Sequence, residues 1–384
     1  MDFLKADLEQ LAGLGLTRSL RRHDDRPGRL IEIDGNTVLN FSSNNYLGLA
    51  NHPDIVAASK EALVCGTGSS ASRLVTGNLA LHQELESELA DFHGVEAVRI
   101  FNSGYQANIG LIACIAGDGD LIVSDELNHA SMIDGCRLSR AAVSVYQHCN
   151  VDSLRECFGR AGPVRRIFVL TESVFSMDGD CAPLEQLRAV CDEFGAFLVV
   201  DDVHSLGVFG AQGAGLCAEL GVVPDALVGG LGKAFGSFGG YVAGSQLLSE
   251  FLLHKARSFV FSTGLPAAVL GASIAALRVI RSVEGQARRE TLQKRISQFR
   301  LCLEPLGLLE TNSGFSPIFP IVVGNSTTAM NLTELLLSEG VFCQAIRPPT
   351  VKEGTARLRV SLSSLHTEED IDTLICCLRD HCQR

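Results

Sequence analysis

The stretch ALVGGLGKAFGSFGG, residues 226–240, places an apolar segment directly before a glycine-rich turn that holds a single lysine, Lys233. The apolar segment is typical of a buried strand, because it is short and is bounded by glycines. Similar strand-like runs occupy residues 96–101, 121–125, 165–173 and 196–202. Strands that are apolar on both faces and separated by helical segments are typical of a parallel sheet covered by helices on both sides.

Helical patterns alternate with these runs. Residues 183–195 repeat apolar side chains at intervals of three and four and end at a glycine, which predicts a helix. Residues 1–20 predict an amphipathic helix. After about residue 285 the pattern changes to a charged helix, short strands and a final helix, which is typical of a separate small domain.

We therefore predict an α/β protein in three parts. Residues 1–45 form an N-terminal helix and a short strand segment, residues 46–285 form a large α/β domain with a mainly parallel central sheet and helices on both faces, and residues 286–384 form a small α+β domain.

Charge and composition exclude several classes of protein. The formal net charge of −12 argues against a nucleic-acid partner, which needs a concentrated basic surface. No apolar run approaches the roughly 18 residues that a membrane span requires. The 13 cysteines are spread through a long chain without a secretory signal, so we expect reduced thiols, a cytoplasmic location and no zinc site.

Polar residues collect at one predicted edge of the sheet. In open α/β sheets the ligand lies beyond the carboxyl ends of the strands. The segments that follow the predicted strands contain Gly104 and Tyr105, His129, Asp201, His204 and Lys233. These residues are the candidates for a ligand site.

Lys233 does not belong to a nucleotide-binding loop. The phosphate-binding GxxxxGK[ST] loop needs a glycine where this chain has Leu227, and a serine or threonine where it has Ala234. No GxGxxG dinucleotide motif follows a strand either. An isolated lysine can instead act as an amine nucleophile that forms a Schiff base, and the glycines around it permit close approach of a flat cofactor. A solvated lysine in a surface turn is the alternative.

The neighbouring residues favour the cofactor. A carboxylate such as Asp201 at a strand end can pair with the protonated pyridine nitrogen of pyridoxal 5′-phosphate (PLP). The first-turn amides of Gly104 and Tyr105 could hold its phosphate at a helix N-terminus, although a plain helix cap is the alternative. His129 could stack on the pyridine ring and act as an acid or base, whereas an isolated histidine is more often a core residue.

Four motifs carry a specific resemblance. DELNHAS (125–131), SVFSMDGDCAPL (173–184), VVDDVHSLGVFG (199–210) and GLGKAFG (230–236) resemble, in order, the α-oxoamine synthases of the fold type I aminotransferase superfamily. The resemblance covers nearly the whole chain. It implies a PLP enzyme with the fold type I architecture.

The resemblance also implies a role for each residue of the motifs. Lys233 is the lysine that binds the cofactor and later removes the Cα proton of the substrate. Asp201 faces the pyridine nitrogen and His204 the 3′-oxygen of the ring. His129 stacks on the ring and helps to polarise the carbonyl of the acyl substrate. Ser176 contacts the cofactor.

Phosphate binding is shared between subunits in this family. The resemblance assigns the phosphate to Gly104 and Tyr105 together with Thr263 of the neighbouring subunit, and so implies a homodimer with shared active sites. The family commonly has threonine where this chain has Gly230. Loss of a hydroxyl donor to a dianion costs roughly 1.5–3 kcal/mol, so we expect weaker cofactor retention than in a Gly230→Thr variant.

The ends of the chain indicate the branch of the family. NFSSNNYLGLANHP (40–53) and AIRPPTVKEGTARLRVSLSSLHT (345–367) are most similar to the branch that condenses L-alanine with a pimeloyl thioester in biotin biosynthesis. The thioester is carried by coenzyme A or an acyl carrier protein. The alternatives are sister synthases that use glycine or serine, and a non-catalytic subunit of the same fold.

In that branch the substrate contacts fall on polar residues of both chain ends. Arg359 binds the carboxylate of the amino acid, as a bidentate fork can. The other expected substrate contacts are Arg21, which meets the acyl substrate, Asn44, Arg347 and Thr350. Arg357, by contrast, is expected on a solvated strand face.

Overall fold

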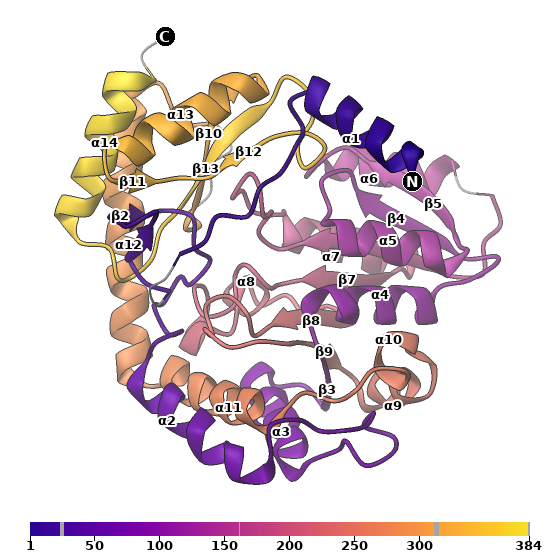
Figure 1. Ribbon diagram of the computed structural model, residues 1–384. Helices are drawn as coiled ribbons and strands as arrows, with labels where there is room; N and C mark the ends of the chain where they lie inside the picture. Colours follow the sequence, from indigo (N-terminus) through magenta and orange to yellow (C-terminus); the bar gives the residue numbers. More distant parts are fainter. Residues whose placement is uncertain (24–26, 161, 311–314, 383–384) are drawn as a thin grey trace. The chain divides into compact units, whose positions relative to one another are not determined.

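The computed structural model describes residues 1–23, 27–160, 162–310 and 315–382 (Figure 1). The chain divides into two compact units. The terminal unit contains Met1–Asn44, Met177–Gly179 and Thr291–Arg384, and the central unit contains Asn45–Ser176 and Asp180–Glu290. Among the described residues, no helix combines the length and apolar character needed to cross a membrane.

The central unit is built on a seven-stranded sheet with the order β3-β9-β8-β7-β6-β4-β5. Its strands are β3 (Ala97–Phe101), β4 (Leu121–Asp125), β5 (Ala142–Tyr146), β6 (Ile167–Glu172), β7 (Phe197–Asp201), β8 (Ala226–Gly230) and β9 (Gly240–Gly244). Strands β5, β4, β6, β7 and β8 are parallel, and β9 runs antiparallel to both β3 and β8. The predicted α/β class with a mainly parallel sheet is confirmed.

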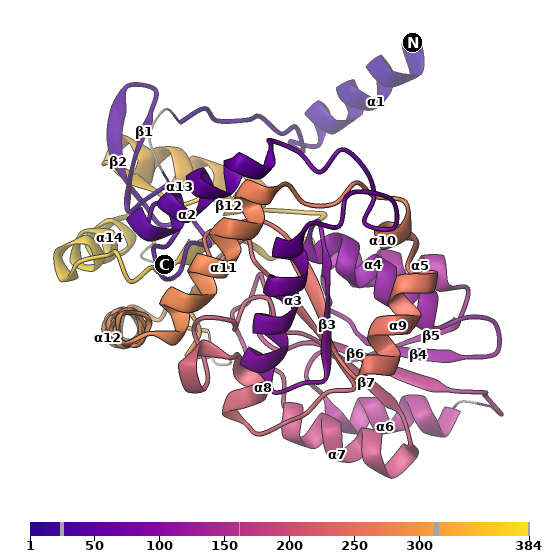
Figure 2. The ribbon, with the colours of Figure 1, turned by 90° about the horizontal axis from the view of Figure 1, so that it is seen from below.

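Helices cover both faces of this sheet. They are α2 (Pro53–Ala62), α3 (Ala80–His93), α4 (Gly104–Ile115), α5 (Ala130–Ser139), α6 (Val151–Arg160), α7 (Leu184–Phe194), α8 (Leu216–Glu219), α9 (Gln246–Lys255), α10 (Arg257–Val260) and α11 (Ala267–Arg281), with short 3₁₀ turns at Leu63–Cys65 and Ala211–Gly213. Helices α4 and α5 lie on one face, and α6 and α7 on the other (Figure 2). Apolar side chains of α4, such as Leu111 and Ile112, pack on Val199 and Val228 of the strands to form a buried core.

Local sequence signals explain where the helices next to the strand ends begin and stop. Ser103 caps α4 by accepting a hydrogen bond from the backbone N–H of Gln106 at 3.1 Å. His129 caps α5 in the same way through Ser131. Helix α7 stops at Gly195, which adopts the left-handed conformation that glycine permits. Two of these caps lie at the predicted ligand edge.

The terminal unit combines both ends of the chain. Strands β1 (Leu30–Ile33) and β2 (Asn36–Asn40) form a hairpin, and β2 pairs in parallel with β11 (Val341–Phe342). A second sheet has the order β10-β13-β12, from β10 (Ile318–Gly324), β13 (Ala356–Ser361) and β12 (Ala345–Ile346). The helices are α1 (Asp2–Gly13), α13 (Ser326–Ser338) and α14 (Glu368–His381), with a 3₁₀ turn at Glu304–Leu306, and α12 (Val283–Leu303) spans the boundary between the units.

Five strands of the central sheet were predicted within a few residues, and so were α7 and α12, whereas α1 ends at Gly13, well before the predicted end at residue 20. The predictions missed β5 and β9. Strand β9 begins and ends with glycine, which is depleted in strands, and most of β5 is exposed or half-buried, so neither gives a strong apolar signal. The division of the chain into three domains stays a prediction.

Candidate active site

The parallel strands of the central unit deliver the predicted residues to one edge of the sheet. Asp201 is the last residue of β7, His129 follows β4, and Lys233 follows β8. Because these strands run in the same direction, their carboxyl ends meet at that edge. The contacts of these residues show which of them lie together at this edge.

Lys233 lies in a short chain of hydrogen-bonding groups. Its Nζ is 2.6 Å from Nε2 of His204, and Nδ1 of His204 is 2.7 Å from the hydroxyl of Tyr46. His204 and Tyr46 are buried and Lys233 is half-buried. The histidine is thus held from both ring nitrogens, and it orients the amine of Lys233 at the rim of the sheet.

Asp201 is buried with a fixed orientation. Its Oδ2 accepts a hydrogen bond from Nδ2 of Asn108 at 2.6 Å, and its Oδ1 accepts one from the backbone N–H of Val203 at 3.1 Å. Asn108 belongs to α4 and also donates to Ser131 at 2.9 Å. The amide side chain therefore links Asp201 to the start of α5, where His129 lies.

His129 is held in one tautomer. Its Nδ1 accepts the backbone N–H of Ser131 at 3.2 Å and lies 2.7 Å from the Ser131 hydroxyl. Burial lowers the pKa of His129, the charge of Lys233 lowers it further, and Asp201 acts in the opposite direction. In the neutral ring the proton accordingly sits on Nε2. The ring of Tyr105 meets the His129 ring edge-on at a centroid distance of 6.4 Å.

Val203 fills the space between two glycines of the candidate phosphate site. A Cβ atom added at Gly230 would lie 2.6 Å from Cγ1 of Val203, and one added at Gly104 would lie 3.7 Å from Cγ2. A contact of 2.6 Å is too short for real Cβ atoms, so a side chain at position 230 requires Val203 to move. Gly230, where the resemblance leads us to expect threonine, is thus matched by the branched side chain of Val203 beside it.

Ser176 and Glu172 lie at the end of β6. Ser176 is buried, and Glu172 is buried beside Asp201. Burial raises the pKa of Glu172 well above its usual value and the Asp201 charge adds to this, while Lys233 and the backbone N–H groups of His129 and Ser176 lower it. Sequence reasoning did not assign a role to Glu172, the last residue of β6.

Thr263 lies close to the start of α4 in the same chain. Its backbone carbonyl accepts a hydrogen bond from Asn102 at 2.8 Å, and it bridges to Ser72. The residue is exposed. Its predicted contact with the phosphate of a neighbouring subunit stays a prediction.

The residues of the central unit fit PLP. They include an amine for its aldehyde, a buried and oriented carboxylate for its pyridine nitrogen, and a capped helix N-terminus for its phosphate. The absence of a side chain on Gly104 leaves the amides at the start of α4 open to an anion. These three groups match the aldehyde, the ring nitrogen and the phosphate of the cofactor.

The terminal unit holds the predicted substrate residues. Arg359 of β13 is buried, and its Nη1 donates to Oδ1 of Asn44 at 3.0 Å and to the Ser361 hydroxyl at 2.7 Å. Thus the structure brings Arg359 and Asn44 together, although 315 residues separate them in the chain.

The other predicted substrate residues of the terminal unit have contacts of their own. Arg347 donates to the backbone carbonyls of Gly15 and Thr17, and Arg21 pairs with Glu334 of α13. Thr350 is exposed and follows Arg347 in a turn. These contacts place none of the three beside Arg359, so their assignment to the substrate stays a prediction.

The prediction for Arg357 was wrong. The residue is buried rather than solvated, and its guanidinium forms an ion pair with Asp178 and donates to the Thr355 carbonyl at 3.0 Å. Every residue of β13 is buried, so this strand has no solvated face. Arginine alternates with apolar residues in β13, and the same alternation is typical of a strand with one exposed face. The pattern therefore does not distinguish the two cases.

Sequence reasoning also missed Tyr46, Asn108 and Val203. Tyr46 and Asn108 contact His204 and Asp201 across 158 and 93 residues of chain, and no local pattern reports such pairs. Val203 had a signal of its own, because it lies between two residues already assigned to the site.

Comparison with known proteins identifies the family of this chain. Residues 36–378 match the family "aminotransferase class I and II". The 8-amino-7-oxononanoate synthase of Geobacter sulfurreducens is 45% identical over 378 residues (98% of this chain and 96% of the relative), and that of Geobacter metallireducens is 47% identical over 368 residues (95% and 94%).

Solved structures of related enzymes have a similar fold. A variant of serine palmitoyltransferase from S. paucimobilis with bound PLP and myriocin has a TM-score of 0.92 at 30% identity, covering 99% of this chain and 96% of its own. The 8-amino-7-oxononanoate synthase of Francisella tularensis has a TM-score of 0.78 at 27% identity, covering 90% and 98%. The chain belongs to the 8-amino-7-oxononanoate synthase family of the class I and II aminotransferases.

Proposed function

We propose that this chain catalyses the condensation of L-alanine with a pimeloyl thioester, releasing CO2 and the free thiol and forming 8-amino-7-oxononanoate for biotin biosynthesis. The observation that carries the proposal is the group formed by Lys233, His204 and Asp201, which occupies the strand ends of a chain 45% identical to such enzymes over nearly its full length. The cofactor is PLP, as the family match and the structural relatives indicate.

Residues of the central unit hold the cofactor in this proposal. Gly104 and Tyr105 offer backbone amides to the phosphate, Asp201 pairs with the ring nitrogen, and His204 contacts the 3′-oxygen. Ser176 and the partner subunit's Thr263 complete the set by resemblance. When bound, PLP supplies a protonated ring that accepts the electron pair left on the substrate carbon.

Lys233 carries the proton at the reacting carbon. Its amine removes the Cα proton of alanine, and it returns a proton to the same carbon after CO2 has left. The hydrogen bond from His204 holds the amine in position, and the Tyr46 hydroxyl holds the histidine. A base must lie within hydrogen-bond reach of the proton that it removes, and an oriented amine favours this.

His129 acts on the acyl substrate. Its Nε2–H can donate a hydrogen bond to the thioester carbonyl, because Nδ1 is occupied as an acceptor. Negative charge builds on that oxygen when the substrate carbon attacks, and a donor aimed at it lowers the barrier. The bond between the carbonyl carbon and sulfur then breaks, and the thiol leaves as the new carbon–carbon bond is completed.

Arg359 binds the carboxylate of alanine. Its contacts with Asn44 and Ser361 orient the guanidinium, whose planar fork suits a carboxylate. The same carboxylate is later lost as CO2, so the arginine binds the group that leaves. Arg21, Arg347 and Thr350 are the further substrate contacts that the resemblance assigns.

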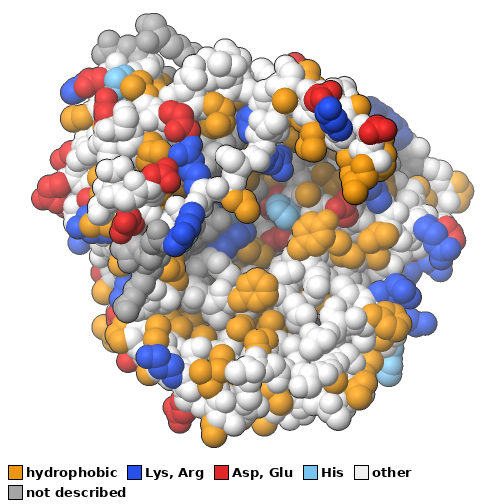
Figure 3. Space-filling view, viewed as in Figure 1, with side chains coloured by type: hydrophobic (Ala, Val, Ile, Leu, Met, Phe, Trp, Pro, Cys, Tyr) orange, Lys and Arg blue, Asp and Glu red, His pale blue; other side chains and the backbone are white. Residues whose placement is uncertain are grey.

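The enzyme is a homodimer in this proposal. The central unit exposes large apolar side chains on the segments around the Ser72–Thr263 bridge: Val64, Leu74, Val75 and Phe261. Figure 3 shows hydrophobic side chains among polar ones over the lower part of the view, where Figure 1 draws α2 and α10. Exposed apolar residues of this kind favour association, and association would bring Thr263 to a second active site.

A matrix of substrates tests the proposed reaction. The purified holoenzyme is incubated with alanine, glycine or serine and with the pimeloyl, acetyl, succinyl or palmitoyl thioester of coenzyme A, and thiol release is measured. We expect the highest kcat/KM for alanine with the pimeloyl thioester. Pimeloyl acyl carrier protein is a further arm that identifies the carrier. A preference for glycine or serine would assign the chain to a sister branch, and no turnover with a bound cofactor would support a non-catalytic subunit.

Gly230 and Val203 should behave as a coupled pair in cofactor binding. The sequence alone predicted tighter PLP binding in Gly230→Thr than in wild type, but the structure reverses this expectation. Gly230→Thr alone is expected to weaken PLP binding, because the new Cβ meets Val203 at 2.6 Å. The double variant V203A/G230T makes room for the threonine hydroxyl and should bind PLP more tightly than wild type, by roughly tenfold if one charge-assisted hydrogen bond is gained. Cofactor titration of the wild-type, V203A, G230T and V203A/G230T apoproteins measures this. If G230T alone binds as tightly as V203A/G230T, the steric argument is wrong.

A further inference from the structure

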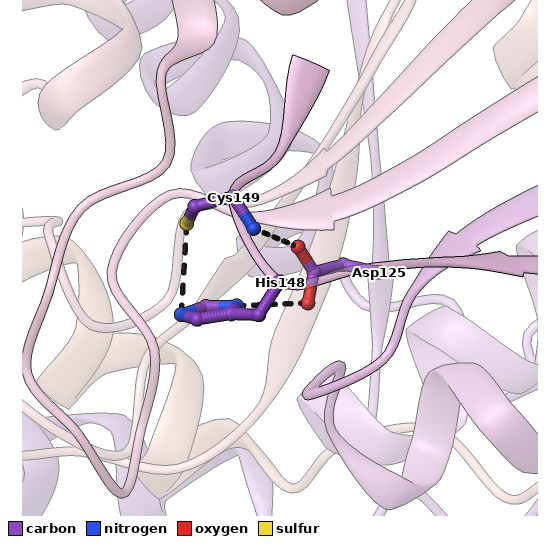
Figure 4. A group of neighbouring side chains, drawn as sticks. All are labelled: Asp125, His148 and Cys149. Atoms are coloured by element: carbon purple, nitrogen blue, oxygen red, sulfur yellow. Dashed lines mark hydrogen bonds and ion pairs between the residues drawn. The ribbon is translucent and has the colours of Figure 1, made fainter. Parts of the chain in front are cut away.

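His148 lies between two buried carboxylates below the active site edge. It follows β5, and its Nδ1 is 2.9 Å from Oδ1 of Asp125 while its Nε2 is 2.7 Å from Oδ2 of Asp180. Asp125 is 2% exposed and Asp180 is 7% exposed. Figure 4 shows the imidazole beside the Asp125 carboxylate and the Cys149 sulfur. Both ring nitrogens face acceptors, so the ring satisfies both only as an imidazolium.

This cluster suits a proton better than a metal ion. Ligand atoms of Asp125, His148 and Cys149 lie within 4.8 Å of one another, a spacing compatible with a metal. However, Asp125 faces Nδ1, whereas the Cys149 sulfur is 3.6 Å from Nε2 (Figure 4). An ion on one ring nitrogen would displace a hydrogen bond to a buried carboxylate. The imidazolium offsets one of the two carboxylate charges, and the backbone N–H groups of Leu127 and Cys149 donate to Asp125.

The two carboxylates belong to the segments that carry active site residues. Asp125 ends β4, four residues before His129, and Asp180 lies four residues after Ser176. The backbone N–H of Phe175 donates to the Asp180 carbonyl at 3.0 Å, and the Phe175 ring packs edge-on against His148 at 4.3 Å. His148 therefore contacts both sides of the turn that holds Ser176.

We propose that His148 is a positioning residue whose imidazolium ties the segment carrying His129 to the segment carrying Ser176, and so sets the geometry of the cofactor site. The inference rests on the proposed function, because it assigns His129 and Ser176 to the cofactor. Without the cation, two buried carboxylates would be left without a counter-charge, which is costly in a protein interior.

The charge of His148 should persist through the neutral pH range. Burial lowers the pKa of His148, but hydrogen bonds to Asp125, Asp180 and Cys149 raise it to about 12. The other charged group that faces the residue is Glu126, which accepts its backbone N–H at 3.2 Å. Since the folded pKa exceeds the ordinary 6.5, the stabilisation is complete below pH 6.5 and declines as the pH rises towards the folded pKa.

His148→Gln and the double variant H148Q/D180N test the proposal, with the exposed His254→Gln as the matched control. PLP affinity is measured by titrating each apoprotein, kcat and KM for alanine by thiol release, and folding by circular dichroism and the thermal midpoint. We expect H148Q to lower the thermal midpoint, most strongly below pH 6.5, and to weaken PLP binding and kcat by up to about 10²-fold, the effect of a misplacement of roughly 1 Å.

The double variant separates positioning from charge balance. Removing one carboxylate together with the cation should restore much of the thermal midpoint but neither the PLP affinity nor kcat. Recovery of all three would overturn the proposal, because His148 would then only neutralise charge, and so would wild-type PLP affinity in H148Q. If H148Q does not fold, the double variant decides alone. The titration of PLP needs no substrate, so failure of the proposed reaction leaves this readout intact.

Discussion

Lys233→Ala is expected to remove both covalent capture of the cofactor and turnover. The amine is the group that joins the PLP aldehyde in the proposed site, and the methyl group of alanine offers neither a nucleophile nor a base. Loss of a general base alone typically costs about 10²–10⁴-fold in rate, and loss of the nucleophile adds to this. Borohydride treatment followed by protein mass measurement should show cofactor attached to wild type and none to the variant.

A matched control separates the site from general effects of losing a lysine. Lys255 is exposed at the end of α9, and Lys255→Ala should keep both the covalent attachment and the wild-type rate. Cofactor that remains attached to K233A after reduction would move the nucleophile to another lysine. The contact of 2.6 Å between Lys233 and His204 would then need a purely structural explanation.

The parts of the fold that the sequence predicted are those with strong local patterns. Strands β4, β7 and β8 are short apolar runs that end in polar or glycine residues, and each was placed within a residue or two. Strand β9 starts and ends with glycine, and it forms because β3 and β8 bind it on both sides. Such a strand is stabilised by its neighbours rather than by its own residues, so a local pattern does not reveal it.

The residues of the candidate site also fall into two groups: those that a local sequence pattern predicts and those that only the folded chain brings together. Asp201 ends a strand, Lys233, His204 and His129 follow strands, and the rule for ligand position in open sheets selected them as candidates. The residues that orient them come from distant parts of the chain: Tyr46 holds His204, and Asn108 holds Asp201. Their roles depend on the order of the strands, which no single segment specifies.

At Arg357 the local sequence pattern gave a wrong prediction. An arginine that alternates with apolar residues is typical of a half-solvated strand. Here β13 lies between β10 and β12, and the ion pair with Asp178 allows the charge to be buried. A buried charge needs a partner, and the partner comes from the segment Met177–Gly179, far away in the sequence.

Asp201→Asn is expected to slow formation of the substrate carbanion by about 10²–10³-fold, the usual cost of removing one group that stabilises charge in the transition state. The amide keeps the size of the carboxylate but cannot keep the ring nitrogen protonated. It also lacks one acceptor, so it can satisfy only one of the two donors, Asn108 and the backbone N–H of Val203. Solvent exchange of the alanine Cα proton, followed by NMR without thioester, measures this step alone.

The exchanged pair N108D/D201N distinguishes the position of the charge from the hydrogen bond. It keeps one carboxylate and one amide in contact, with the charge moved from β7 to α4. If Asp201 acts through its charge at the ring nitrogen, exchange in the double variant should stay as slow as in D201N. Recovery of wild-type exchange would show that any charge in this hydrogen-bonded pair suffices. Covalent attachment through Lys233 should persist in both variants, because the amine is unchanged, and its loss would mean that Asp201 acts on cofactor binding rather than on the carbanion.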